Sequence, residues 1–207
     1  MDSAVCLYLS KREGNATRAL TIRLHGIARG EVRAAASLAR AAGVLEHRFF
    51  PMPELRELGD IQAPRRGLAA LPPSYIPMKN AIYYGVAAAF AEEVGASRVI
   101  GGHNRDDRAV FEDTSDRFFA EMERALRAGS ARLREVDFRI SRPLQGMSKA
   151  EVVALAVELG VPLELTWCCH SAGSAHCWRC DGCAQRERAF SEAGVEDPLR
   201  SRDTKRV

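Results

Sequence analysis

Residues 18–51 read RALTIRLHGIARGEVRAAASLARAAGVLEHRFFP, and this stretch indicates the class of fold. Residues 18–26 are rich in β-branched and apolar side chains, as strands are. Residues 30–43 form an alanine-rich segment that ends at Gly43, which is typical of a helix and its C-terminal cap. Residues 46–52 are again strand-like. Strand, helix and strand in this order predict a parallel sheet covered by helices.

The same alternation continues before and after this stretch. Periodicity and composition predict helices from Asp2, over 78–95 and over 114–128, and strands over 97–104 and 137–143. Residues 54–77 are rich in turn formers and charges, which is typical of a surface connection. The whole pattern predicts an α/β protein with a Rossmann-like, doubly wound parallel sheet. Such sheets bind ligands outside the carboxyl ends of their strands.

One helix boundary is defined by its own residues. Ser148 and Glu151 form an S-x-x-E capping box ahead of an apolar segment. Gly160 and Pro162 follow that segment. We therefore predict a helix that starts at Ser148 and stops at Gly160.

The composition is that of an ordinary globular protein with one core, since 46% of the 207 residues are hydrophobic and 28% are charged. A net charge of +3 is too small for a dedicated nucleic-acid binder, although it suits anionic small molecules. No apolar run reaches the roughly 18 residues of a membrane span, and the first residues lack the layout of a signal peptide. We therefore expect a cytoplasmic protein with no membrane segment and no direct nucleic-acid partner.

Five of the six cysteines lie between Cys168 and Cys183, which without a secretory context indicates a metal site. Two residues separate Cys177 from Cys180 and Cys180 from Cys183, so that these thiolates can converge on one ion. Cys169 lies upstream of these three in the sequence and can supply the fourth ligand. A closed site with four sulfur ligands is typical of structural zinc.

Other interpretations of the cysteines remain open. An iron–sulfur cluster is the main rival, although the next cysteine of the ferredoxin pattern is absent. Unligated or disulfide-bonded cysteines are a further alternative. Cys168 could replace its neighbour Cys169, and His170 and His176 are close enough in sequence to compete as ligands. Cys6 is interpreted as a core residue inside the first helix.

Five sequence blocks follow one another in an informative order. They are SYIPMKNAIY (74–83), GGHNRDDRAVFEDTSDRFF (101–119), MSKAEVVALAVELGVP (147–162), TWCCHSAGSAHCWRCDGCAQRERAF (166–190) and GVEDP (194–198). Together they resemble the ordered motifs of the 7-cyano-7-deazaguanine synthases of queuosine and archaeosine biosynthesis, which are pyrophosphatase-loop ATP enzymes. The resemblance is good from Ser74 onward and loose before it. The chain departs from the family at Lys79, where arginine is usual.

The resemblance implies a fold like that of the adenine nucleotide alpha hydrolases, with a phosphate loop of sequence S-G-G-x-D-S. Glycines in such a loop let backbone N–H groups approach pyrophosphate. Met1, Asp2 and Ser3 match the last three loop positions, so we expect Asp2 and Ser3 to bind the nucleotide. We also expect a strand and Ser-Gly-Gly, roughly ten residues in all, to precede Met1. The domains are then 1–163, an ATP pyrophosphatase-type domain lacking its first strand, and 164–207, a zinc-binding module packed on it.

The implied activity is the ATP-dependent conversion of 7-carboxy-7-deazaguanine and ammonia to 7-cyano-7-deazaguanine through adenylated intermediates, with release of AMP and pyrophosphate. ATP is then a cosubstrate, magnesium accompanies its phosphates, and zinc is structural. The family tends to dimerise, which makes a homodimer an expectation. Phe111 offers a stacking face for the base. The catalytic residues that the resemblance implies are Lys79, Asn80, Asp107, Asp113 and Lys149.

Each of these residues also has an ordinary structural interpretation. Lys79 is expected to stabilise phosphate charge, but most lysines are simply solvated. Asn80 could instead be a local turn or cap residue. Asp107 and Asp113 can accept hydrogen bonds from a guanine-like edge, whereas Asp113 could merely cap the next helix. Lys149 opposes the dipole at its helix start, which favours a ligand role.

Two other functions remain open. A tRNA-thiolating enzyme of the same ATP superfamily would carry a catalytic thiol and a basic tRNA-binding region, and neither is evident. A zinc-containing binding module that keeps the fold without the activity is favoured by the incomplete loop. An assay of ATP conversion to AMP with 7-carboxy-7-deazaguanine and ammonia separates these three functions.

Overall fold

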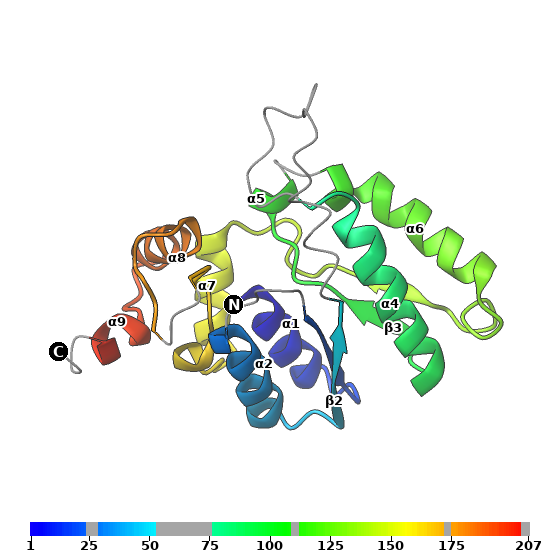
Figure 1. The fold of residues 1–207 in the computed structure, drawn as a ribbon, viewed down its shortest axis with the longest axis horizontal. Helices are drawn as coiled ribbons and strands as arrows, with labels where there is room; N and C mark the ends of the chain where they lie inside the picture. Colours follow the sequence, from blue (N-terminus) through cyan, green and yellow to red (C-terminus); the bar gives the residue numbers. More distant parts are fainter. Residues whose placement is uncertain (24–28, 53–75, 109–111, 172–174, 204–207) are drawn as a thin grey trace.

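The computed structural model describes residues 1–23, 29–52, 76–108, 112–171 and 175–203 (Figure 1). Its elements are α1 (Asp2–Arg12), β1 (Arg18–Arg23), α2 (Arg29–Ala42), β2 (Glu46–Pro51), α4 (Lys79–Val94), β3 (Arg98–Ile100), α5 (Arg105–Arg108), η1 (Glu112–Thr114), α6 (Asp116–Gly129), β4 (Arg139–Ser141), α7 (Lys149–Glu158), η2 (Leu163–Leu165), α8 (Asp181–Glu192) and α9 (Pro198–Asp203). Helices alternate with short parallel strands, so the predicted α/β class is confirmed. Most of the predicted connection over 54–77 lies outside the described residues, as does Phe111.

The described strands form two parallel pairs, whereas we predicted a single sheet. β1 pairs with β2, from Arg18 opposite Glu46 to Arg23 opposite Pro51. β3 pairs with β4, and Val99 lies opposite the middle residue of β4. The difference from the prediction arises because no described strand pairs with both β1 and β3.

The helix predicted from the capping box is confirmed. The Ser148 hydroxyl accepts a hydrogen bond from the backbone N–H of Glu151 at 3.2 Å, and the Glu151 carboxylate accepts one from the Ser148 N–H at 2.6 Å. Gly160 follows the helix with a φ of 64°. Glycine adopts this left-handed conformation without strain, so the chain can leave the helix there.

Two clusters of buried side chains form the core. The first cluster lies where α1, α7 and α8 meet, and it includes Val5, Val152, Val153, Ala156 and Phe190. The second lies between α4, α6 and β4, and it includes Tyr84, Ala88, Phe119 and Ile140. Cys6 belongs to the first cluster and is buried, which confirms its interpretation as a core residue. In the part of the chain that the structure describes, no helix combines the length and the apolar character needed to cross a membrane.

Candidate functional site

The first turn of α1 carries an ion pair with a residue far away in sequence. The Lys149 ammonium donates to Asp2 Oδ2 at 2.5 Å, and the Asn104 side-chain amide donates to Asp2 Oδ1 at 3.3 Å. Burial opposes the ionised form of Asp2, but the nearby Lys149 charge outweighs it and the pKa of Asp2 lies below its usual value. Two of the predicted site residues are therefore in direct contact at a helix N-terminus.

The loop after β3 packs directly against this helix start. A Cβ atom on Gly102 would lie 2.8 Å from the backbone nitrogen of Ser3 and 2.9 Å from the carbonyl carbon of Asp2. Any residue other than glycine would push α1 away from the end of β3. The close packing holds the first turn of α1 at the carboxyl end of a strand, where this class of fold binds ligands. A helix N-terminus in this place favours an anionic ligand such as phosphate.

A cavity of about 380 Å³ lies between β1, β3 and α4. Five predicted site residues line it, namely Ser3, Lys79, Asn80, Asp107 and Asp113. Apolar side chains of the same three elements line the remainder, among them Leu20, Ile22, Ala87, Val99 and Ile100. The structure therefore brings residues from three separate sequence blocks to one cavity with a polar part and an apolar part.

A second cavity of about 240 Å³ borders the Asp2 ion pair. The predicted residues Asp2 and Lys149 line it, together with Glu31 at the start of α2 and Cys168. Burial raises the pKa of the Glu31 carboxyl. Asp2 and the Lys149 side chain that pairs with it thus line a cavity that extends to the cysteine-rich segment.

Asp113 holds the first turn of α4. Its carboxylate accepts a hydrogen bond from the backbone N–H of Asn80 at 3.2 Å, and its carbonyl accepts one from the Asn80 side chain at 3.1 Å. The interpretation of Asp113 as the cap of the next helix is wrong, because Ser115 caps α6 by accepting from the Phe118 N–H at 3.2 Å. Asp113 and Asn80 instead form one unit at the cavity.

Asn104 organises the loop that presents Asp107. Its side-chain oxygen accepts from the N–H groups of Asp106 and Asp107 at 2.8 and 3.1 Å, and the Asp107 carboxylate accepts from the Asn104 N–H at 3.2 Å. The adjacent His103 stacks on Tyr84 with ring centroids 5.8 Å apart, and burial lowers the pKa of His103. Sequence reasoning missed both rings. Tyr84 lies on an apolar helix face, which is typical of a core, and nothing local distinguishes His103 in the loop after β3.

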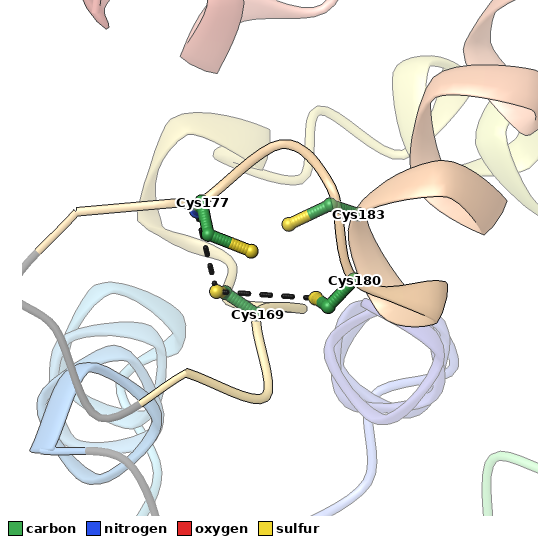
Figure 2. A group of neighbouring side chains, drawn as sticks. All are labelled: Cys169, Cys177, Cys180 and Cys183. Carbon is green, nitrogen blue, oxygen red and sulfur yellow. Dashed lines mark hydrogen bonds between the residues drawn. The ribbon is translucent and has the colours of Figure 1, made fainter.

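Four cysteine thiols converge in the C-terminal part of the chain (Figure 2). The sulfur atoms of Cys169, Cys177, Cys180 and Cys183 all lie within 4.8 Å of one another. The Cys169 and Cys180 sulfurs are 4.0 Å apart. Four thiolates held tetrahedrally by zinc at about 2.3 Å would lie about 3.8 Å apart, so the arrangement fits such an ion.

Backbone N–H groups point at these sulfur atoms. Cys169 Sγ accepts from the N–H groups of Cys177 and Ser171 at 3.3 and 3.4 Å, and Cys180 Sγ accepts from His170 at 3.5 Å. Hydrogen bonds, led by the one from Ser171, lower the pKa of the Cys177 thiol to about 5. Donors of this kind stabilise thiolates and orient metal ligands. The donor set is that of a closed thiolate metal site.

Three side chains could have competed as ligands, namely Cys168, His170 and His176. None of them belongs to this group of four. The Cys168 N–H donates to His176 Nε2 at 3.4 Å, and the His176 ring packs against Trp167 with centroids 4.2 Å apart. Cys168 and His170 line the second cavity. Cys169 is therefore the member of the cysteine pair that joins the group.

A buried ion pair ties α8 to the rest of the protein. Arg186 donates from Nε and Nη2 to the two carboxylate oxygens of Asp197 at 2.6 and 2.8 Å, and from Nη1 to the Thr166 hydroxyl at 2.6 Å. The R-x-x-A-F and G-x-x-D-P blocks contain Arg186 and Asp197, but nothing local in either block indicates that they pair. This contact fastens the helix that carries Cys183 to η2 and to the start of α9.

Comparison of the sequence with known proteins shows which family it is similar to. The sequence profile of the queuosine biosynthesis protein QueC matches residues 1–194. The 7-cyano-7-deazaguanine synthase of Thermoplasma acidophilum is 35% identical, over 82% of this chain and 74% of the relative. The enzyme of the same name from Thermosynechococcus vestitus is 36% identical, over 96% of this chain and 91% of the relative. Among solved structures, NMN synthetase from Francisella tularensis superposes with a TM-score of 0.49 at 19% identity, covering 94% of this chain and 74% of that one.

Proposed function

Because the chain belongs to the family of the queuosine biosynthesis protein QueC, we propose that it makes 7-cyano-7-deazaguanine from 7-carboxy-7-deazaguanine, ammonia and ATP. Relatives that share 35 and 36% of their aligned residues with most of this chain carry the name of that synthase. The contact between Asp2 and Lys149 at the start of α1 is the observation that carries the proposal. It joins Asp2, which is expected to bind the nucleotide, to Lys149, which is expected to be a catalytic residue.

The proposed reaction forms a nitrile from a carboxylate in two activation steps. The substrate carboxylate attacks the α-phosphorus of ATP and pyrophosphate leaves. Ammonia then adds to the acyl carbon, and AMP leaves with the carboxyl oxygen to give an amide. The amide oxygen attacks a second ATP, again with release of pyrophosphate. Loss of AMP and of the two amide protons leaves a carbon–nitrogen triple bond.

We propose that the start of α1 holds the ATP phosphates. The helix dipole and the Lys149 ammonium both favour negative charge there, and the Ser3 hydroxyl can donate to pyrophosphate. Asp2 is ionised in this place, so it can orient Lys149 or accept a magnesium ion that accompanies the phosphates. Lys79 lines the neighbouring cavity and is assigned to phosphate charge. Electrostatic positioning of this kind supplies most of the catalysis in phosphoryl and nucleotidyl transfer.

We further propose that Asp107 and Asp113 recognise the guanine-like edge of the substrate. One Asp113 oxygen accepts from Asn80, and a carboxylate has further lone pairs for the N–H donors of a base. Asn80 thus orients the carboxylate that binds the base. The Asn104 turn does the same for Asp107. This division of roles assigns the base to the part of the cavity around Asp107 and Asp113, and the phosphates to the start of α1 and the part of the cavity around Lys79.

Zinc is the metal that we assign to the four cysteines. Four sulfur ligands leave no open position on a tetrahedral ion, so the role of the metal is to fold residues 164–207. We propose that these residues form a module on the main domain of residues 1–163, and the buried contact of Arg186 with Asp197 and Thr166 supports such packing. The six cysteines all lie in the described part of the chain and none forms a disulfide, which supports our proposal that the protein works in the reducing cytoplasm.

The test is an assay of AMP release by the chain with 7-carboxy-7-deazaguanine, ammonia and ATP. We expect two AMP per nitrile formed, and replacement Lys149→Met should lower the rate by about 100-fold. Arg12→Met is the matched control, since Arg12 lies at the other end of α1 in an exposed ion pair with Glu158. Turnover only with a tRNA and a sulfur donor would select a thiolating enzyme instead. A complete lack of turnover by the full-length protein would select a binding module.

Two proposals concern assembly. We propose that the substrates are small molecules and that no nucleic acid is bound directly, as the modest net charge of +3 suggests. We also propose a homodimer, because the family tends to dimerise. Light scattering on the purified chain, with and without tRNA, measures both. A monomer, or a stable complex with tRNA, would contradict these proposals.

A further inference from the structure

The Tyr84 hydroxyl is buried without a hydrogen-bond partner. Its side chain extends from the second turn of α4 and is 6% exposed. Among the residues that the structure describes, none donates a hydrogen bond to its oxygen or accepts one from it. Buried polar groups are costly when they stay unpaired, so they are paired with another protein group, an ordered water or a ligand. The hydroxyl therefore needs a partner beyond the described residues.

This hydroxyl lies at the carboxyl end of β3. A Cβ atom on Gly101 would overlap the Tyr84 oxygen, so only glycine leaves room for the hydroxyl there. Gly101 and Tyr84 both line the cavity of about 380 Å³. The carboxyl ends of parallel strands are where this class of fold binds ligands. The unpaired oxygen thus belongs to a residue in the wall of the cavity to which we assign the base.

Two ring contacts fix the orientation of the Tyr84 side chain. Its ring packs edge-on against Phe119 with centroids 4.8 Å apart, and it stacks on His103 with centroids 5.8 Å apart. Phe119 is 2% exposed and belongs to the core cluster between α4, α6 and β4. Packing of this kind holds the hydroxyl at one defined place, as recognition of a single ligand atom requires.

Tyr84 also lies close to the carboxylate that we propose to bind the base. It follows Asn80 by four residues on α4, so both side chains project from the same face of the helix. Asn80 donates to Asp113 from its backbone N–H and from its side chain. The hydroxyl and the group that holds Asp113 are therefore one helical turn apart, a rise of about 5 Å along the helix.

The two groups have opposite hydrogen-bonding character. Burial raises the pKa of Tyr84 above its ordinary value, so its hydroxyl stays protonated at neutral pH and can donate. An ionised carboxylate such as that of Asp113 only accepts. A guanine-like base presents a ring carbonyl, which accepts, beside N–H groups, which donate. The donor and the acceptor of the cavity thus match the acceptor and the donors of this base edge.

We propose that the Tyr84 hydroxyl donates a hydrogen bond to the ring carbonyl of the substrate base, while Asp107 and Asp113 accept from its N–H groups. This inference rests on the proposed function, to which it adds a specificity-determining residue. A base that carries hydrogen in place of the carbonyl oxygen leaves the hydroxyl unpaired, and one that carries an amine there brings a second donor against it. Tyr84 therefore selects a base with a carbonyl at this position.

Binding of two bases to two variants tests the inference. The probes are 7-carboxy-7-deazaguanine and its analogue with hydrogen in place of the ring carbonyl oxygen, and calorimetry measures their Kd in the absence of ATP. Tyr84→Phe should weaken binding of the first about tenfold or more and change binding of the analogue by less than about twofold. Tyr8→Phe is the matched control, because Tyr8 of α1 packs against the other core cluster, and it should change neither Kd.

Thermal unfolding without ligand separates recognition from a structural role. Because none of the described residues pairs with the hydroxyl, Tyr84→Phe should keep or raise the Tm. Unchanged affinity of this variant for 7-carboxy-7-deazaguanine would overturn the inference, and a lower Tm would then assign the hydroxyl to an ordered water or a structural contact. Equal loss of affinity for both bases would also overturn it. Failure of the natural chain to bind either base would instead refute the proposed function, and this inference with it.

Discussion

Replacing Asp197 with Asn should destabilise the protein by about 3–5 kcal/mol, because it leaves the Arg186 guanidinium buried without a counter-charge. The two side chains are 2% and 6% exposed, and two hydrogen bonds at 2.6 and 2.8 Å join them. Asparagine keeps nearly the same shape and can still accept from the Leu199 N–H, which Asp197 does at 3.0 Å. The substitution therefore removes charge and little else.

The magnitude follows from the surroundings of Arg186. Its remaining partners, the Thr166 hydroxyl and the Leu163 carbonyl, are neutral and cannot balance a buried positive charge. For a chain of this size, 1 kcal/mol corresponds to about 2–4 °C in Tm, so the loss amounts to about 6–20 °C. Because Arg186 lies one turn after Cys183 on α8, metal should also leave the variant more readily.

Urea unfolding followed by circular dichroism, at pH 7 and with metal in excess, measures the change in the free energy of unfolding. The matched control is the double variant Arg186→Met with Asp197→Leu, which removes both charges and should cost less than Asp197→Asn alone. A loss below about 1 kcal/mol in the single variant, or a double variant that is less stable than the single one, would refute the reasoning.

Three further predictions concern the metal, the base and pH. Cys180→Ser should abolish binding of about one zinc per chain and unfold residues around the cluster, whereas Cys168→Ser should keep the metal, as measured by elemental analysis and proteolysis; visible absorbance with stoichiometric iron would contradict the zinc assignment. Asp113→Asn should weaken 7-carboxy-7-deazaguanine binding about tenfold more than ATP binding in calorimetry, and an equal loss of both would refute a role in base recognition. Burial opposes ionisation of Asp2, but the nearby Lys149 charge outweighs it and lowers the pKa of Asp2 below its usual value of 3.8. The contribution of this ion pair to stability is therefore present above pH 3.8 and is lost as pH falls through the pKa of Asp2 in the folded protein. The stability difference between the natural chain and Asp2→Asn should therefore shrink on acidification below pH 3.8, and a difference that grows instead would contradict the pairing.

Features that depend on neighbouring residues could be predicted from the sequence. The Ser148 and Glu151 capping box needs only one helical turn, and the structure has both of its hydrogen bonds. The spacing of Cys177, Cys180 and Cys183 likewise lets a single turn bring their thiols together. Resemblance to a family extended this local information to the candidate site, because ordered sequence blocks identify residues whose contacts are not local.

Only the tertiary structure decided how distant segments meet. The choice of Cys169 over Cys168 depends on which thiol faces the other three, and adjacent residues in a chain are not distinguished by spacing. The roles of Asp113, which holds α4 and does not cap α6, and of Arg186 as the buried partner of Asp197 depend on contacts across the fold. The same is true of strand pairing: among the described residues, β1 pairs with β2 and β3 pairs with β4. Alternating strands and helices specify a parallel sheet, but backbone hydrogen bonds between strands form only where the packing of helices brings the edges together.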